Sequence, residues 1–317
     1  MTKGKNNLLD ISDISKDEIK NLIKLASFFS EVSKRPVPKV PVLQARQVVT
    51  AFFEPSTRTR LSFEVAAKRL SADVVTFTAS TSSITKGESV KDTAMTLQSL
   101  GADLLIVRHA SAGVPHQIAG WVDVPVVNAG DGRHQHPSQA LLDCYTISDT
   151  FSLIDCNFTG LEIGIVGDIL NSRVARSCIE AFTALGAKVT VVATPTLLPS
   201  AKFLSVAEGS VSFTENLDEV LPQLDVLYLL RVQLERMEKN AFPTVREYNR
   251  RFGLDASRAA VMKKSAVVMH PGPINRGVEI ASDVADYPNM LIGEQVKNGI
   301  AMRMAIIYYI LTSKYEL

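Results

Sequence analysis

The sequence predicts an α/β fold with two doubly wound domains, each formed by a parallel sheet with helices on both faces. Its 317 residues are enough for two domains, because one domain usually takes roughly 100–200 residues. Short β-rich segments alternate with helical patterns along the chain, which is typical of parallel sheets. The apolar segment 226–230 lacks the alternation of a strand with one wet face, so burial on both faces is expected.

The expected elements follow one another in a regular order. Ser15 and Glu18 form a capping box, which predicts that an amphipathic helix begins there and runs to about residue 34. Strands are expected at residues 48–53, 74–78, 104–107 and 124–128 of the first half, and at residues 162–166, 188–193, 211–214, 226–230 and 266–269 of the second. Between them, helices are expected at residues 59–70, 90–100, 137–149, 173–185 and 244–251.

The domain boundary is expected at residues 151–160, which follow a long helix and precede a new strand. This divides the chain into domains of residues 1–150 and 151–294. The C-terminal segment 295–317 contains a final helix, and we expect this segment to pack back on the first domain. Its apolar part, 301–311, contains Arg303 and is too short to span a bilayer, so it predicts a buried helix.

Composition and charge exclude several classes of protein. Hydrophobic residues make up 46% of the chain, which therefore can bury sizeable cores. The formal net charge of +1 gives no overall field for nucleic acid or an anionic membrane. Cys144, Cys156 and Cys178 form no C-x-x-C pair, which argues against a disulfide framework and a zinc site, and no metal is expected. Residues 1–7 lead into no apolar segment, so we expect a cytoplasmic protein.

Polar side chains gather where the expected strands end, and ligands of open α/β sheets bind outside the carboxyl ends of strands. Arginine recurs at these ends in both halves of a nearly neutral chain. We therefore expect a site for a ligand with several negative charges, in a cleft between the two domains. The strand-end residues are Ser56, Thr57, Arg58, Thr59, Arg60, Arg108, His136 and Gln139 in the first half, and Asp168, Arg173, Arg231, Gln233 and residues 270–276 in the second.

Each of these motifs also has a structural interpretation. Residues 56–59 are compatible with an ordinary N-cap and with a phosphate cradle at a helix N-terminus. His136 is compatible with a structural or a catalytic role, and Arg108 and Arg231 with solvated strand ends or with ligand binding. Residues 270–273 are compatible with a rigid turn or with carbonyl groups directed at a ligand. Arg60, Arg133 and His134 are assigned structural roles.

Four segments resemble the aspartate and ornithine carbamoyltransferase family. Residues 53–60, Phe-Glu-Pro-Ser-Thr-Arg-Thr-Arg, resemble its carbamoyl-phosphate signature, and residues 136–139, His-Pro-Ser-Gln, resemble its second signature. Residues 231–233 and 270–273 resemble the aspartate enzymes of the family. The Ser-Met-Gly and His-Cys-Leu-Pro segments expected of the ornithine enzymes do not occur. The resemblance extends over nearly the whole chain.

This resemblance implies transfer of the carbamoyl group of carbamoyl phosphate to L-aspartate, without a cofactor or metal. The first domain would bind carbamoyl phosphate and the second aspartate. By motif, carbamoyl phosphate would be bound by Ser56, Thr57, Arg58, Thr59, Arg108, His136, Gln139, Gly272 and Pro273, and aspartate by Lys86, Arg173, Arg231 and Gln233. The implied catalytic residues are Arg58, Thr59, Lys86, Arg108 and His136. Gly272 stands where many relatives have Leu or Ala, and the implied contact there is through the backbone.

The resemblance also implies a homotrimer with shared active sites and an early step of de novo pyrimidine biosynthesis. Lys86, together with Ser82 or Ser83, would reach into the neighbouring subunit's site from the polar loop 80–89. This loop is not a Walker A motif, because Gly87 follows the lysine and no glycine precedes it at the required spacing. A regulatory or pathway-enzyme partner is compatible with the resemblance.

Three other functions compete with this interpretation. A two-domain solute-binding protein would also have an arginine-lined cleft, but such proteins are usually exported. A nicotinamide dehydrogenase is suggested by the strand and turn at 165–168, which lack the G-x-G-x-x-G spacing. Transfer to ornithine or another amine is the nearest alternative within the same enzyme class.

Overall fold

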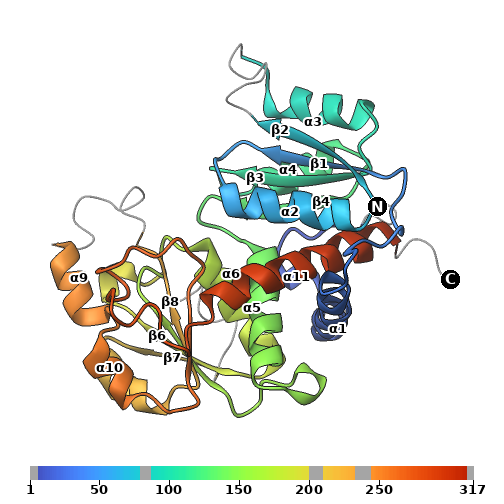
Figure 1. The fold of residues 1–317 in the computed structure, drawn as a ribbon. Coiled ribbons are helices and arrows are strands. Elements are labelled where there is room, and N and C mark those ends of the chain that lie inside the picture. Colours follow the sequence, from blue (N-terminus) through green and yellow to red (C-terminus); the bar gives the residue numbers. More distant parts are fainter. Residues whose placement is uncertain (1–5, 79–86, 200–209, 233–243, 313–317) are drawn as a thin grey trace. The chain divides into compact units, whose positions relative to one another are not determined.

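The computed structural model describes residues 6–78, 87–199, 210–232 and 244–312 (Figure 1). The chain divides into two compact units, which are Met1–Tyr145 with Lys297–Leu317 (unit 1) and Thr146–Val296 (unit 2). Each unit has its own sheet, and every strand pair in both sheets is parallel. The predicted fold of two parallel-sheet α/β domains is therefore confirmed.

Unit 1 is built on a four-stranded sheet with the order β2-β1-β3-β4. Its strands are β1 (Gln47–Phe52), β2 (Asp73–Thr78), β3 (Leu104–His109) and β4 (Val126–Asp131). Its helices are η1 (Ile11–Asp13), α1 (Lys16–Ser33), α2 (Thr57–Arg69), α3 (Val90–Ser99) and α4 (Val114–Trp121). The N-terminal segment is attached to β4, because Leu8 N donates to Val126 O and Leu8 O accepts from Asn128 N.

The sheet of unit 1 is covered on both faces, as the apolar sequences of β1 and β3 predict. On one face, Val49, Ala51, Leu105 and Val107 of the strands belong to a buried cluster with Ala94, Leu97, Val114 and Ile118 of α3 and α4. On the other face, α2 packs on β1 and β2 through its buried side, which includes Phe63 (Figure 1). Helices therefore cover both faces of the sheet, as in a doubly wound domain.

The C-terminal helix α11 (Ile292–Thr312) belongs to unit 1 from Lys297 onwards. The guanidinium carbon of Arg303 lies 5.1 Å from the ring centre of Phe63 on α2. Tyr309 donates a hydrogen bond to Glu18 of α1 at 2.7 Å, and Tyr308 packs against Phe29. Residues 301–311 are mostly buried, which confirms the buried helix predicted from their composition.

Unit 2 is built on a five-stranded sheet with the order β7-β6-β5-β8-β9. Its strands are β5 (Glu162–Val166), β6 (Lys188–Val192), β7 (Val211–Thr214), β8 (Val226–Leu229) and β9 (Val267–Met269). Its helical segments are η4 (Ile154–Cys156), α6 (Arg173–Leu185), η5 (Pro195–Leu197), α8 (Leu217–Val220), η7 (Leu221–Gln223), α9 (Val245–Phe252) and α10 (Ala256–Val261). Phe158, Phe182 and Tyr228 form a buried aromatic chain with ring centres 6.3 Å apart at each step.

Some elements differ from their predicted positions. The strand predicted at 124–128 runs from Val126 to Asp131, because His109 of β3 pairs with Asp131 beyond a bulge. Helix α4 was not predicted; it is a short helix that follows Gly113, which has a φ of 81°. The helix α5 (Pro137–Thr150) crosses the boundary between the units, as α11 does.

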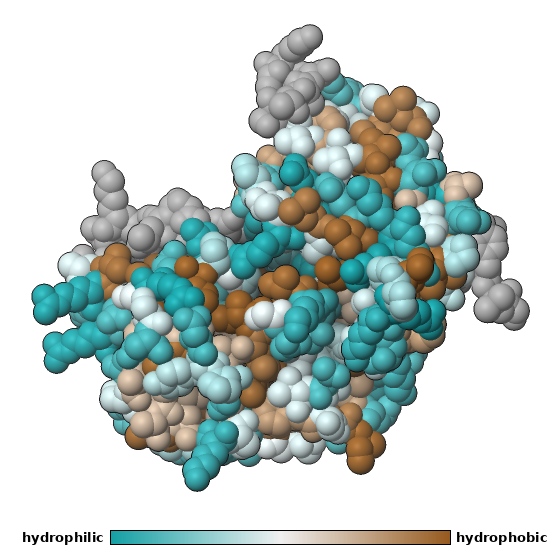
Figure 2. All heavy atoms as spheres, viewed as in Figure 1, coloured by the Kyte–Doolittle hydropathy of each residue, from teal (hydrophilic) through white to brown (hydrophobic). Residues whose placement is uncertain are grey.

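The surface shown in Figure 2 is mixed in polarity. Hydrophilic side chains are interspersed with hydrophobic ones on the face that Figure 2 shows. Among the described residues, no helix has both the length and the apolar character needed to cross a membrane.

Candidate active site

The N-terminus of α2 forms the first part of the candidate site. Ser56 occupies the N-cap position, with φ −159° and ψ 109°, but its side chain makes no capping hydrogen bond. Ser56 therefore holds the N-cap position without the usual side-chain hydrogen bond, a geometry compatible with both the N-cap and the phosphate-cradle interpretations. The first N–H groups of a helix have no partner within it and carry partial positive charge, which favours an anion at this end.

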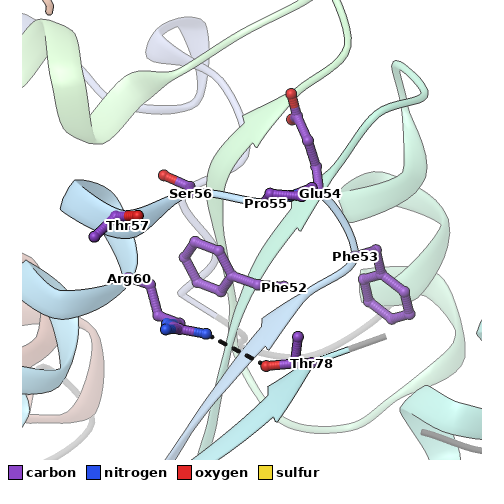
Figure 3. A pocket seen from close by; sticks show the side chains of 8 residues that line it. All are labelled: Phe52, Phe53, Glu54, Pro55, Ser56, Thr57, Arg60 and Thr78. Atoms are coloured by element: carbon purple, nitrogen blue, oxygen red, sulfur yellow. Dashed lines mark hydrogen bonds between the residues drawn. The ribbon is translucent and has the colours of Figure 1, made fainter. Parts of the chain in front are cut away.

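A cavity of about 210 Å³ lies at this end of α2 (Figure 3). It is lined by Phe52, Phe53, Glu54, Pro55, Ser56, Thr57, Arg60 and Thr78. Arg60, which was assigned a structural role, lines the cavity and donates to Thr78 Oγ1 at 3.4 Å. Arg58 is exposed and Thr59 is buried, and neither is among the lining residues.

Arg108 at the end of β3 lies beside the segment that leads into α2. The register pairs Phe52 with Arg108, and Phe53 N donates to Arg108 O at 2.9 Å. The Arg108 side chain lies 3.4 Å from a carboxylate oxygen of Glu54 and donates to Ala129 O at 3.3 Å. Glu54 was not predicted as a site residue, although it stands within the signature segment. The pair holds the guanidinium near the cavity-lining segment.

His136 and Gln139 follow β4 at the start of α5, and both side chains are buried. His136 Nδ1 lies 3.4 Å from Ser138 Oγ, and Gln139 Nε2 donates to both carboxylate oxygens of Asp143 at 3.2 and 3.3 Å. Asp143 and Arg303 are charged groups buried in the same unit. Burial lowers the pKa of Arg303 to about 10, although the Asp143 carboxylate acts in the opposite direction. Asp143 stands one helical turn after Gln139, a spacing that indicates contact.

The turn before His136 is fixed by Asp131. Its buried carboxylate accepts hydrogen bonds from Gly113 N at 2.7 Å, Asn128 Nδ2 at 2.9 Å and Gln135 N at 3.0 Å. Burial alone would raise the pKa of Asp131, but hydrogen bonds, led by that of His134, outweigh burial and lower it. The carboxylate is thus held ionised, and it orders the backbone that leads to His136.

Gly132 in this turn allows a direct test of the packing. It has a φ of +44°, and a Cβ atom there would lie 2.7 Å from Ala112 N. We expect Gly132→Ala to lower the free energy of unfolding by about 1–3 kcal/mol. Gly120→Ala in α4 is the matched control, because no atom lies within 4 Å of its added Cβ. The control should be neutral or stabilising by roughly 0.5–1 kcal/mol, and urea unfolding measures both. Equal stability of the two variants would contradict the packing argument.

Unit 2 places its candidate arginines after β5 and β8. Arg173 is the first residue of α6 and is buried, and the preceding Ser172 caps the helix by accepting from Ala175 N at 3.1 Å. Arg231 follows β8 and is partly exposed. Gly167, at the end of β5, has a φ of +120°, and a Cβ there would overlap with the Tyr248 hydroxyl. The glycine at 167 therefore serves close packing with Tyr248.

A buried carboxylate joins the segment after β8 to the segment after β9. Glu279 accepts hydrogen bonds from Val232 N at 2.7 Å, Asn275 N at 2.8 Å and Asn275 Nδ2 at 2.8 Å. Burial raises the pKa of Glu279, although these hydrogen bonds act against the shift. Glu279 was not predicted, and its sequence gives no signal, because its partner Val232 is 47 residues away.

The turn at 270–273 is held by the side chains of His270 and Gln295. His270 N donates to Gln295 Oε1 at 3.0 Å, and Gly272 N donates to His270 Nδ1 at 2.8 Å. Gly272 has a φ of 64°, a conformation that favours glycine. Gly272 is partly exposed and Pro273 is exposed.

Within each unit, the structure brings several candidates to the carboxyl ends of the strands. In unit 1 these are Ser56, Thr57, Thr59, Arg108, His136 and Gln139, and in unit 2 they are Arg173, Arg231, Gly272 and Pro273. Lys86, Gln233, Ser82 and Ser83 lie outside the described residues. A helix N-terminus with hydroxyls and arginine suits a phosphate, and arginine pairs suit a dicarboxylate.

Comparison with known proteins agrees with this arrangement. Residues 6–149 match the family model described as "Aspartate/ornithine carbamoyltransferase, carbamoyl-P binding domain", and residues 159–310 match "Aspartate/ornithine carbamoyltransferase, Asp/Orn binding domain". The chain is 54% identical over 306 residues to the aspartate carbamoyltransferase catalytic subunit of Parafrankia sp. (strain EAN1pec), covering 96% of both chains.

Solved structures show the same similarity. The aspartate transcarbamoylase of Trypanosoma cruzi in complex with carbamoyl phosphate and aspartate is 31% identical, with a TM-score of 0.86 and coverage of 97% of both chains. Its complex with N-(phosphonacetyl)-L-aspartic acid is 32% identical, with a TM-score of 0.85 and coverage of 97% of this chain and 95% of that chain. Since both halves match the family models and the identity extends over nearly the whole chain, this protein belongs to the aspartate/ornithine carbamoyltransferase family.

Proposed function

We propose that this chain transfers the carbamoyl group of carbamoyl phosphate to the α-amine of L-aspartate, giving N-carbamoyl-L-aspartate and phosphate. The observation that carries the proposal is the cavity at the α2 N-terminus, which is lined by Ser56 and Thr57. This cavity combines helix N–H groups and hydroxyls, which are donors suited to a phosphate. The named activity of the similar proteins supports the same reaction.

Carbamoyl phosphate binding is assigned to residues of unit 1, with a backbone contribution from Gly272 and Pro273 of unit 2. Ser56, Thr57 and Thr59 would donate to the phosphate together with the first N–H groups of α2, and Arg58 would pair with its charge. Arg108 and His136 would donate to the carbamoyl oxygen, with Gln139 held nearby by Asp143. The backbone at Gly272 and Pro273 would accept from the carbamoyl amino group.

The chemistry is a nucleophilic acyl transfer. The neutral amine of aspartate attacks the carbamoyl carbon, a tetrahedral oxyanion forms, and the bond to phosphate breaks. Arg108, His136 and Thr59 would stabilise the oxyanion, an effect worth about 10²–10³ in rate for one donor. The amine proton passes to the departing phosphate, which has the basic oxygens to take it.

Aspartate binding is assigned to Arg173, Arg231 and Gln233, with Lys86 supplied by a neighbouring subunit. Two guanidinium groups match the two carboxylates of aspartate, whereas ornithine would bring a second ammonium towards them. We therefore expect carbamoyl transfer to aspartate and little or none to ornithine in a colorimetric assay with both acceptors. Equal or faster citrulline formation would overturn the acceptor assignment.

Binding of N-(phosphonacetyl)-L-aspartic acid provides an independent measurement. This ligand carries both a phosphonate and an aspartate group, so it should bind far more tightly than phosphate or aspartate alone. Titration calorimetry with the three ligands measures this difference. Similar affinities would contradict a single site that holds both substrates.

The proposed assembly is a homotrimer with shared sites, in which Arg58 serves its own subunit and Lys86 the neighbouring one. Arg58→Ala and Lys86→Ala chains should each be inactive. After subunit exchange in an equal mixture, about a quarter of the sites should contain both intact residues and recover activity. Native mass spectrometry confirms the exchange. Exchange without recovered activity would rule out the shared site.

We also place this reaction in the cytoplasm, at an early step of de novo pyrimidine biosynthesis. The support is the resemblance of the sequence motifs to this family. Growth of a pyrimidine-requiring strain that lacks this activity, rescued by the gene for this chain, would test the pathway assignment.

A further inference from the structure

A carboxylate and two imidazoles meet in unit 1, outside the residues proposed for carbamoyl transfer. Asp10 precedes η1, His116 lies on α4, and His134 lies in the turn after β4. Asp10 Oδ2 is 3.0 Å from His116 Nε2, and Asp10 Oδ1 is 3.6 Å from His134 Nδ1. One ligand atom from each of the three residues lies within 4.8 Å of the other two.

These separations suit a small divalent metal ion. Zinc binds nitrogen and oxygen ligands at about 2.0–2.2 Å, so the edges of its tetrahedron measure roughly 3.3 Å. The separations of 3.0 and 3.6 Å involve different oxygens of Asp10, with Oδ2 towards His116 and Oδ1 towards His134. One ligand atom of each residue lies within 4.8 Å of the other two, so small side-chain rotations would bring the three onto one ion.

The backbone around the cluster is held in place without a metal. Leu8 N donates to Val126 O at 3.0 Å, and Asn128 Nδ2 donates to Leu9 O at 2.9 Å, so the segment before Asp10 is fixed on β4. The start of α4 is tied to the end of β4 by the hydrogen bond from Gly113 N to Asp131. Three segments distant in sequence are therefore positioned together.

The chemistry of the cluster favours a transition metal over magnesium or calcium. Imidazole nitrogen is a preferred ligand of zinc and its neighbours, whereas the harder ions take oxygen ligands. Asp10 Oδ1 is buried and has no hydrogen bond among the described residues. The carboxylate of Asp131, 3.2 Å from His134 Nδ1, adds negative charge beside the cluster, and a metal bound at that nitrogen would replace the proton shared with Asp131. The side chains of His116 and His134 are 39% and 38% exposed, which leaves a route for the ion and for a water ligand.

We propose that Asp10, His116 and His134 form a binding site for a divalent transition-metal ion of the zinc class. A bound ion joins the N-terminal segment and α4 to the turn that ends two residues before His136. The site escapes sequence inspection, because Asp10 and His116 are 106 residues apart and meet only in the fold.

Zinc titration of chelator-treated protein, followed by calorimetry in the absence of substrate, tests the site. We expect one zinc ion per chain. Asp10→Asn, His116→Gln and His134→Gln should each weaken zinc binding by more than about 100-fold, because loss of an outer-sphere partner alone costs up to about that much. His109→Gln and Glu31→Gln are the matched controls, because they remove a histidine and an exposed carboxylate elsewhere in unit 1 and should bind as the wild type does. Excess magnesium should not compete.

Thermal unfolding with and without zinc is the second measurement. The melting temperature of the wild type and the two controls should rise with zinc, and that of the three cluster variants should not. Absence of binding in the wild type, or binding that the cluster variants leave unchanged, overturns the site. Should one variant fail to fold, the other two decide. Because no substrate is present, either result is independent of carbamoyl transfer.

Discussion

Replacement of Arg108 by alanine is expected to lower kcat by about 10²–10³, the effect of removing one oxyanion donor. The binding of aspartate should change much less, because the arginines proposed to bind it, Arg173 and Arg231, belong to unit 2. Steady-state kinetics with each substrate varied in turn measures both effects. Arg133→Ala is the matched control, since Arg133 is an exposed arginine of the same unit that is not among the proposed substrate-binding or catalytic residues. It should retain near-normal activity.

Glu54 makes it possible to separate two roles of Arg108. The two side chains are only 12% and 17% exposed, so loss of the arginine leaves a largely buried carboxylate without its ion-pair partner. If Arg108 served only to neutralise Glu54, the double variant Glu54→Ala/Arg108→Ala would regain activity. We expect the double variant to remain as slow as Arg108→Ala. Recovery would remove Arg108 from the catalytic residues.

Replacement of Glu279 by alanine is expected to affect both stability and aspartate binding. Three donors, two of them backbone N–H groups, lose their acceptor in a site where Glu279 is only 1% exposed. Because a buried unsatisfied donor costs about 1–3 kcal/mol and such values are not additive, we expect a loss of about 2–5 kcal/mol in unfolding free energy. The KM for aspartate should rise at least about tenfold, since a misplacement of 1 Å is enough for such an effect.

Two further variants define the role of Glu279. Glu279→Gln keeps one oxygen acceptor but places an amide group near Asn275 N, so its effects should be intermediate. Asp286→Asn is the control, because it removes an exposed carboxylate that pairs with Arg276 in the same unit. In chemical unfolding and in aspartate saturation curves, this control should behave like the wild type. A stable Glu279→Ala protein with an unchanged KM for aspartate would exclude Glu279 as a positioning residue.

The fold was largely predictable from local patterns. The helix predicted at 173–185 is observed as Arg173–Leu185, because Ser172 caps its start and Gly186, with a φ of 104°, ends it. The buried strand predicted at 226–230 is observed as Val226–Leu229. Helix α4 escaped prediction because its eight residues include a proline and a glycine, and they are too few to establish a clear period.

The candidate site was predictable where it depends on strand ends, and not where it depends on contacts between distant segments. Arg108 lies at the end of β3 and His136 in the segment that leads from β4 to α5, so the parallel topology places both at one edge of the sheet. Asp143 becomes relevant only through Gln139, and Glu279 only through Val232. Such buried carboxylates depend on the three-dimensional arrangement of backbone donors, which composition and periodicity do not contain.

The order of the units along the chain has a consequence for biosynthesis. Unit 1 consists of two stretches of sequence, and all of unit 2 lies between them. A ribosome therefore makes the whole of unit 2 before it makes the helix that covers Phe63 of α2. Since domains generally fold as units during synthesis, unit 2 is able to fold first, while unit 1 waits for residues of α11 to close its core. A chain truncated after residue 296 should accordingly resist protease in unit 2 and be cleaved in unit 1.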